Sequence, residues 1–257
     1  MAALSPMMQQ YFDIKKQHPD KILFFRLGDF YEMFYDDAIL ASKELELTLT
    51  GRDCGQEERA PMCGVPFHSY ENYVARLIAK GYKVAICEQM EDPALAKGLV
   101  KRDIIRVVTP GTVIESSMLQ DDKNNYIASI YITEKKAGVC FADVSTGTAH
   151  ATVLTGEKLG PEIISELCRY SPSEVLFNAA ILDYKEVTAY IKQQLACSVE
   201  LLDEAAFAPD ACMEEMRAQF GDAPEKTAGL APESPAFTAL SVLLGYLKET
   251  QKKGVER

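Results

Sequence analysis

The 257-residue sequence lacks the features of a membrane or secreted protein. No apolar run approaches the roughly 18 residues that a membrane-spanning helix needs. The N-terminus has neither the basic start nor the apolar stretch of a signal peptide. We therefore expect a cytoplasmic protein with no membrane partner.

The sequence also lacks the spacing of metal ligands and disulfides. There is no C-x-x-C pair, and the three histidines lie far apart. The seven cysteines are an odd number at wide spacings: 54, 63, 87, 140, 168, 197 and 212. This pattern argues against a zinc site or a disulfide framework and favours reduced thiols. We expect neither a metal site nor a cofactor in this chain.

A positive net charge is missing too, since the formal charge is −11. Residues 1–115 hold 14 Lys and Arg against 17 Asp and Glu, so most of the acidic excess lies in the second half. A local basic cluster stands in the first half: Lys97, Lys101, Arg102 and Arg106. Local potential governs contact with DNA, so the net charge is a weak objection to a DNA role. It does predict poor duplex binding by this chain alone.

The pattern of the first 115 residues predicts a small mixed α/β domain. The expected helices run from Pro6 to about His18, from Asp36 to about Glu44 and from Ser69 to Lys80. The expected strands are Ile22–Leu27, Leu45–Thr50, Tyr82–Glu88 and Ile104–Thr109, and residues 51–61 are predicted as a flexible loop.

A polar linker at 116–125 leads into a second predicted domain at 126–222. Strands at 126–133, 138–144 and 148–154 are joined by turns so short that they imply an antiparallel meander. Helices at 161–170, 183–195 and 209–220 follow, with strands at 174–177 and 198–202. This order is that of a ribonuclease-H-like sheet. After a linker at 223–235, a helix at 236–257 has no later partner, which predicts the truncated start of a third, helical domain.

Four segments carry a resemblance to a known family: Ser5–Tyr11 (SPMMQQY), Leu27–Tyr35 (LGDFYEMFY), Pro61–His68 (PMCGVPFH) and Val84–Gln89 (VAICEQ). With them the chain resembles the amino-terminal part of the bacterial MutS family of DNA mismatch-repair proteins. The resemblance is dense from about Pro6 to Thr112 and implies a mismatch-binding domain, a ribonuclease-H-like connector and the first helix of a core domain.

The resemblance also implies residues and partners. In this family a Phe-x-Glu pair reads the mismatch, and the matching positions are Phe30 and Glu32. The full-length family is a dimeric clamp on mismatched duplex DNA, associated with the nucleoid, which signals to MutL, and only one subunit uses the pair on a given mismatch. Its ATP and Mg²⁺ belong to a C-terminal ATPase that this sequence does not include.

The chemistry of such a pair can be stated. An apolar ring that enters a base step must unstack it, which costs a few kcal/mol and less at a mispaired base. A carboxylate can hydrogen-bond a displaced base, and on an intact duplex we expect its repulsion from phosphates to be uncompensated. The residues alone leave a purely structural alternative open, in which Phe30 is a core aromatic and Glu32 is a solvated turn residue.

The second half of the sequence is compatible with two quite different functions. Asp143 before Ser-Thr-Gly favours turn chemistry, but on a ribonuclease-H-like strand it also fits a metal nuclease, with Glu174, Glu200 and Asp203 as further carboxylates. The acidic character of this half would instead suit a protein-docking module with no DNA role. The basic cluster of the first half is either a set of phosphate contacts or a solvated loop face.

The absence of one motif gives the first testable prediction. No G-x-x-x-x-G-K-[ST] occurs, and Gly156 and Gly160 have the wrong spacing for one. The chain should therefore not be an enzyme, and the purified protein should hydrolyse ATP no faster than the background. Turnover that survives stringent purification would contradict the prediction.

Overall fold

The computed structural model describes residues 4–92, 96, 98–115, 118–119, 123–195 and 197–251. These form two compact units, one built from the chain up to Thr109 together with Gln251, and the other from Pro110–Thr250. Each unit has its own sheet. No helix in the described ranges is long and apolar enough to cross a membrane.

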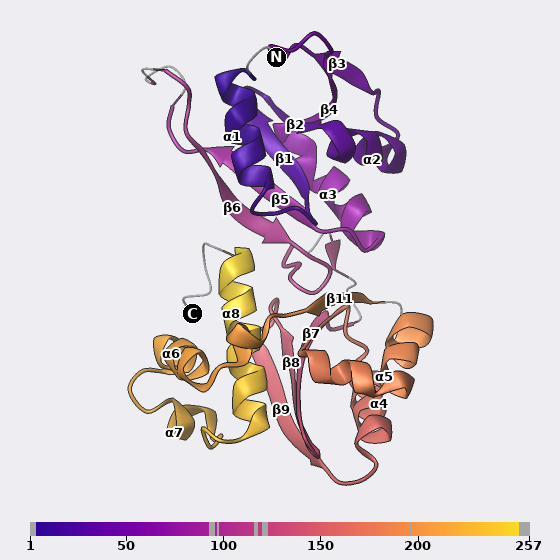
Figure 1. Ribbon diagram of the computed structural model, residues 1–257, viewed down its shortest axis with the longest axis vertical. Helices are drawn as coiled ribbons and strands as arrows, with labels where there is room; N and C mark the ends of the chain where they lie inside the picture. Colours follow the sequence, from indigo (N-terminus) through magenta and orange to yellow (C-terminus); the bar gives the residue numbers. More distant parts are fainter. Residues whose placement is uncertain are drawn as a thin grey trace. The chain divides into compact units, whose positions relative to one another are not determined.

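The first unit is a six-stranded mixed sheet in the order β3-β4-β2-β1-β5-β6. Its strands are β1 (Ile22–Leu27), β2 (Phe30–Phe34), β3 (Thr50–Arg52), β4 (Ala60–Pro66), β5 (Val84–Gln89) and β6 (Arg102–Val108). Its helices are α1 (Pro6–Lys15), α2 (Tyr35–Leu45) and α3 (Tyr70–Ala79), with a 3₁₀ turn at Phe67–Ser69. Helix α1 covers one face of the sheet, and α2 and α3 cover the other (Figure 1).

Local signals explain where the helices begin and end. Pro6 occupies the first turn of α1, and the Ser5 hydroxyl accepts a hydrogen bond from the amide of Met8 at 3.4 Å. Gly81 follows α3 with a φ of +84°, as expected of a glycine that ends a helix. On the α1 face the Tyr11 ring packs edge-on against the rings of Phe25 and Phe34.

Two predictions for this unit are wrong. The expected strand at 45–50 does not form, because α2 runs on to Leu45 and Glu46 closes it in the left-handed conformation with a φ of +60°. The expected loop at 51–61 includes the end of β3 and the start of β4. Strands β2 and β4 were not predicted at all. The predicted linker at 116–125 lies largely outside the described residues.

The second unit is a five-stranded sheet in the order β11-β10-β7-β8-β9. Its strands are β7 (Tyr126–Thr133), β8 (Lys136–Asp143), β9 (Thr148–Thr155), β10 (Glu174–Phe177) and β11 (Ser198–Leu201). Strands β7, β8 and β9 pair antiparallel, while β10 pairs parallel with both β7 and β11. The predicted meander and the ribonuclease-H-like order are confirmed.

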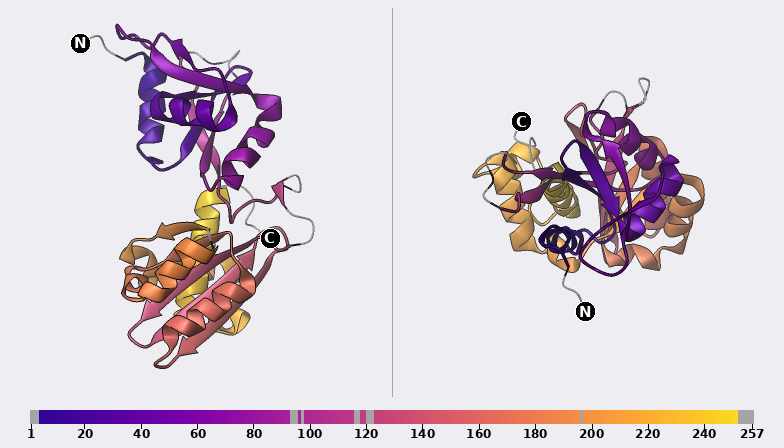
Figure 2. Two further views of the ribbon diagram at one scale, coloured as in Figure 1. Left: turned by 90° about the vertical axis from the view of Figure 1, so that its right-hand side faces the viewer. Right: turned by 90° about the horizontal axis from the view of Figure 1, so that it is seen from above.

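Helices cover both faces of this second sheet. They are α4 (Leu159–Tyr170), α5 (Lys185–Tyr190, continued by a π-helical turn at Ile191–Leu195), α6 (Pro209–Phe220), α7 (Pro224–Ala228) and α8 (Pro235–Gln251), with 3₁₀ turns at Ala179–Asp183 and Glu204–Phe207. Helices α4 and α5 lie on one face, and α6 and α8 on the other (Figures 1 and 2). The short helix α7 falls inside the region predicted as a linker.

Helix α8 packs on strands that precede it in the sequence. Phe237, Leu240 and Leu243 are buried in one core with Ile127 of β7 and Cys140 of β8. The described part of the helix therefore completes the second sheet. Sequence patterning recognised the amphipathic helix but could not show which surface covers it.

A close approach of α8 to β8 gives the second testable prediction. A Cβ at Gly138 would lie 1.9 Å from the carbonyl oxygen of Pro235, so Gly138→Ala must push the helix off the strand. We expect a loss of about 1–3 kcal/mol or more in a thermal or urea melt.

Gly245, which lies within α8 itself, provides the matched control. A Cβ there would meet only the Glu215 side chain, at 3.8 Å or beyond. Gly245→Ala should therefore stabilise the protein by about 0.5–1 kcal/mol. If both variants melted like the parent, α8 would not be held against β8.

Candidate functional site

Two connections of the first sheet meet at one end. Strand β1 ends at Leu27, and β2 begins at Phe30, directly opposite it. Strand β4 ends at Pro66 on the other side of Phe30. The amide of Phe67 then donates a hydrogen bond to the carbonyl of Asp29 at 2.9 Å, which ties the two connections together. The connection between β5 and β6, which includes Lys101, leaves from the same end because β5 runs parallel to β1.

Strand β2 carries the Phe-x-Glu pair from the core to this end. Phe30, Glu32 and Phe34 share one face because side chains alternate along a strand. Phe34 is fully buried, the Glu32 side chain is 14% exposed, and Phe30 is 46% exposed. The neighbouring aromatics Phe24 and Phe25 are fully buried. The alternative that Phe30 is a core aromatic is therefore wrong, and so is the alternative that Glu32 is a solvated turn residue.

Gly64 on β4 leaves room between the two members of the pair. It stands directly opposite Glu32 in the sheet. A Cβ at Gly64 would lie 3.5 Å from Cγ of Glu32 and 3.8 Å from Cδ1 of Phe30. Any side chain at this position would therefore contact both.

Glu32 forms an ion pair that the sequence did not reveal. Its Oε2 atom accepts a hydrogen bond from Nη1 of Arg52, the last residue of β3. The carboxylate is thus already paired in the protein without DNA, and its expected repulsion from the phosphates of an intact duplex stays a prediction. Arg52 lies in a polar stretch of the sequence, and strand β4 separates its strand from that of Glu32. No local pattern links two residues that are 20 positions apart in this way.

The four residues of the basic cluster have different surroundings. Lys97 lies outside the described residues. Lys101 is exposed, and its amide donates to a carboxylate oxygen of Glu91 at 2.8 Å. Arg106 is half-buried on β6, paired with Ile86.

Arg102 corrects the prediction of a phosphate contact. It is only 8% exposed, and its guanidinium donates to the carbonyls of Arg26 at 2.7 Å and Val100 at 2.9 Å and to Oε1 of Gln10 at 3.0 Å. Burial lowers its pKa, and the charge of Arg52 lowers it further. A buried guanidinium that joins three segments of its own unit fits a structural role better than a phosphate contact.

A second polar cluster surrounds Tyr31, on the face of the sheet opposite to Phe30. The guanidinium of Arg26 lies 3.7 Å above the ring of Phe67, and its Nη1 atom is 3.2 Å from Oε1 of Glu88. The Tyr31 hydroxyl donates to the same carboxylate oxygen. Burial raises the pKa of Tyr31, and the hydrogen bond to Glu88 raises it further. Phe67 is 38% exposed, but one face of its ring is occupied by Arg26.

The carboxylates of the second unit do not form a metal-binding set. Asp143 is buried, and its oxygens accept hydrogen bonds from Nδ2 of Asn124 at 2.8 Å, the Asn125 amide at 3.3 Å, and the amide and hydroxyl of Ser145 at 2.9 and 2.6 Å. These bonds favour the turn interpretation of Asp143. Within the described ranges, no three His, Cys, Asp or Glu residues come together as a metal-binding group.

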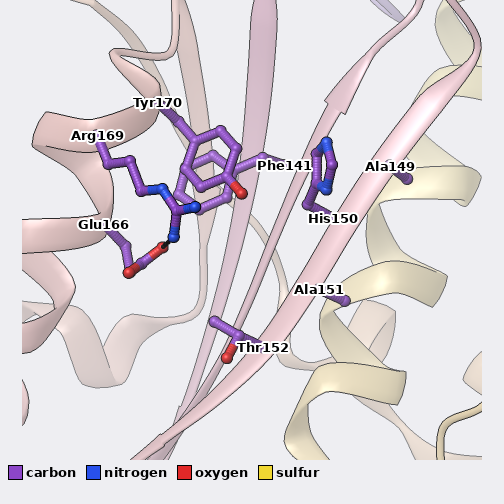
Figure 3. A pocket seen from close by; sticks show the side chains of 8 residues that line it. All are labelled: Phe141, Ala149, His150, Ala151, Thr152, Glu166, Arg169 and Tyr170. Atoms are coloured by element: carbon purple, nitrogen blue, oxygen red, sulfur yellow. Dashed lines mark ion pairs between the residues drawn. The ribbon is translucent and has the colours of Figure 1, made fainter.

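The second unit does contain an open hollow between β9 and α4. Figure 3 shows the Tyr170 ring over Phe141, with His150 of β9 beside them; the stacked rings are 4.1 Å apart. Among the described residues that line the hollow, Glu166 is the only one with a carboxylate, and it lies 4.0 Å from Nη1 of Arg169. A two-metal hydrolase needs several converging carboxylates, so this hollow does not fit a nuclease site.

The burial of β2 gives the third testable prediction. Phe30→Ala should change the free energy of unfolding by less than about 1 kcal/mol, because nearly half of the side chain is already exposed. The matched control, Phe34→Ala, removes a fully buried ring from the same face of the same strand and should cost about 3–5 kcal/mol. If both variants lost the same free energy of unfolding in thermal or urea melts, Phe30 would be a core residue.

Comparisons with known proteins agree with this architecture. The model of MutS domain I matches residues 5–117, and that of MutS domain II matches residues 125–256. The chain is 51% identical over 252 residues to the DNA mismatch repair protein MutS of Ruminiclostridium cellulolyticum and 50% identical over 256 residues to that of Acetivibrio thermocellus; each alignment covers 98% of this chain. The protein of the same name from Clostridium tetani is 49% identical over 249 residues, which are 97% of the chain.

The chain spans between 27% and 29% of the length of these three relatives. Both family models match in the order in which the two units occur, and together they cover nearly all of the described residues. The chain therefore belongs to the MutS family.

Proposed function

We propose that this chain recognises mispaired or looped-out bases in duplex DNA, as the amino-terminal part of a MutS-type repair protein. Phe30 is the wedge that enters the base stack, and Glu32 is the hydrogen-bonding partner of the displaced base. The relatives carry the name DNA mismatch repair protein MutS, which supports this assignment of the process.

The exposure of Phe30 is the observation that carries the proposal. A phenyl ring that is 46% exposed at the start of a strand contributes little to the core, while its neighbours Phe24, Phe25 and Phe34 are fully buried. The strand is anchored on both sides by β1 and β4 and at its far end by Phe34. The ring therefore stands on a rigid support, as a wedge must if it is to push against stacked bases.

The energetics favour use of such a wedge at a mismatch. Unstacking a base step costs a few kcal/mol, and a mispaired base reduces that cost. Stacking of a base on an aromatic ring returns about 1–3 kcal/mol. The protein then distinguishes a mispaired from a paired site by the energy needed to deform the DNA, and not by hydrogen bonds specific to one base.

Glu32 adds a contact that depends on a displaced base. A carboxylate accepts hydrogen bonds from base N–H groups, or donates one when it is protonated. Lys101, which is exposed in the connection between β5 and β6, is proposed to contact a phosphate and so to fix the position of the protein along the duplex. The same role is proposed for Lys97 and Arg106. Arg102 is left out because it is buried and donates three hydrogen bonds within the unit.

The second unit is proposed as the connector between mismatch reading and signalling. In the complete protein it would relay nucleotide state from an ATPase that holds ATP and Mg²⁺, and offer a surface to MutL. The complete protein is proposed to act as a homodimer, in the cytoplasm and on the nucleoid. These proposals rest on membership of the MutS family and not on a site within the described residues.

The fourth testable prediction concerns Phe30 in a full-length protein that carries this sequence. Phe30→Ala removes the stack from every lesion and should weaken binding to G·T and single-base-loop duplexes by about 1–3 kcal/mol. Both affinities should fall close to that for correctly paired DNA. Fluorescence anisotropy with labelled duplexes of identical flanking sequence would measure the three affinities.

Phe67→Ala is the matched control for this experiment. Phe67 is also an exposed phenylalanine at the same end of the sheet, but one face of its ring is covered by Arg26. Its loss should leave the preference for mismatched DNA within about twofold. Retained discrimination in Phe30→Ala, or an equal loss in both variants, would overturn the assignment of Phe30 as the wedge.

A further inference from the structure

The carboxylate of Glu32 is paired with Arg52, and a second cation, Arg102, lies near Arg52 in the first unit. Arg52 bonds it directly, and Arg102 is close enough to Arg52 for the two charges to interact. Arg102 is buried and held by three hydrogen bonds of its own. Arg52 is the accessible member, since its side chain is 38% exposed while that of Glu32 is 14% exposed.

This arrangement changes what an approaching duplex meets. An isolated carboxylate next to Phe30 would repel every phosphate, with or without a mismatch. An ion pair at contact distance presents nearly no net charge, so most of that repulsion is cancelled. A guanidinium has five donors, and one carboxylate uses only part of them, so the pair can persist while the duplex is close.

A displaced base changes the balance. Its N–H group competes with Arg52 for the oxygens of Glu32, and hydrogen bonds to a carboxylate are strong in a partly desolvated site. Arg52 therefore weakens the repulsion of paired DNA and also weakens the attraction for a displaced base. Both effects lower the ratio of mismatch affinity to homoduplex affinity.

We propose that Arg52 is a positioning residue that sets the degree of mismatch discrimination by acting through Glu32. The proposal rests on the function proposed above for Phe30 and Glu32. Arg52 keeps non-specific affinity high enough for the protein to stay on paired DNA, at the cost of part of the discrimination that a bare carboxylate would give.

The test compares Arg52→Gln with the parent in the full-length protein, without nucleotide. Homoduplex affinity should fall, G·T affinity should fall less, and their ratio should rise about two- to fivefold, the range expected for a partly exposed ion pair. The rise should shrink between about 50 and 300 mM salt, because salt screens the exposed carboxylate from the phosphates. Arg52→Lys keeps the charge and should keep the ratio near that of the parent.

A double-variant cycle separates the proposed role from a direct one. In a Glu32→Gln background there is no anion to neutralise, so Arg52→Gln should leave the ratio unchanged. If Arg52 instead touched a phosphate, Arg52→Gln would weaken both duplexes equally, reduce the salt slope by about one, and do so in either background. That result would overturn the proposal.

Arg59 offers a charge-matched control in the connection between β3 and β4. It is exposed, and Arg59→Gln makes the same change in net charge seven residues away. The ratio of G·T affinity to homoduplex affinity in Arg59→Gln should match that of the parent. A rise equal to that in Arg52→Gln would show that the change in net charge alone causes the effect, and would refute the proposal.

Including Phe30→Ala in the same titrations keeps the two proposals distinct. If Phe30→Ala retains discrimination, the proposed function fails. If Phe30→Ala loses it while the effect of Arg52→Gln is independent of Glu32, only the inference about Arg52 fails. A melting temperature of Arg52→Gln far below that of the parent, with the ratio unchanged in the folded protein, would also refute it and make Arg52 structural.

Discussion

The register of β2 between β1 and β4 is the constraint on which the site depends. It places Phe34 beneath α1, leaves Glu32 at the border of the core and brings Phe30 out at the end of the sheet. A shift by one residue would exchange this face for that of Tyr31 and Met33, both of which are buried on the opposite side. Because the strand is packed on both faces at one end, such a shift would expose apolar side chains and bury a carboxylate. The stability of the core thus fixes the geometry of the exposed pair.

The sequence could identify the pair but not its surroundings. Many aromatics stand between positions 24 and 35, and nothing local distinguishes the one that is exposed from those that are buried. The family resemblance singled out Phe30 and Glu32. The partner of Glu32 could not be found in this way, because Arg52 meets it only after the chain has passed through α2 and β3. In the same way the basic cluster looked uniform, although Arg102 is buried and Lys101 is exposed.

For the fold, predictions succeeded where one local signal is enough to determine a strand and its bounds. The strands at 22–27, 126–133 and 174–177 were predicted with their observed bounds, since each is a short apolar run with clear turn residues around it. Prediction failed at 45–50, because a glutamate rather than a glycine ends α2 in the left-handed conformation. The sequence of α8 shows an amphipathic helix, but no local signal indicates that its apolar face packs on strands about a hundred residues earlier.

The two attachments of α8 to its sheet have a mechanical consequence. Near its start the backbone at Pro235 touches Gly138 of β8, and eleven residues later the Tyr246 hydroxyl donates to the buried carboxylate of Glu174 on β10, at 2.8 Å. At a rise of about 1.5 Å per residue, these attachments are roughly 16 Å apart along the helix axis. A rod fixed to a plate at two separated points can neither slide nor rotate against it. A force applied to the C-terminal end of α8 would therefore turn the whole five-stranded sheet as one body, with little loss within the unit.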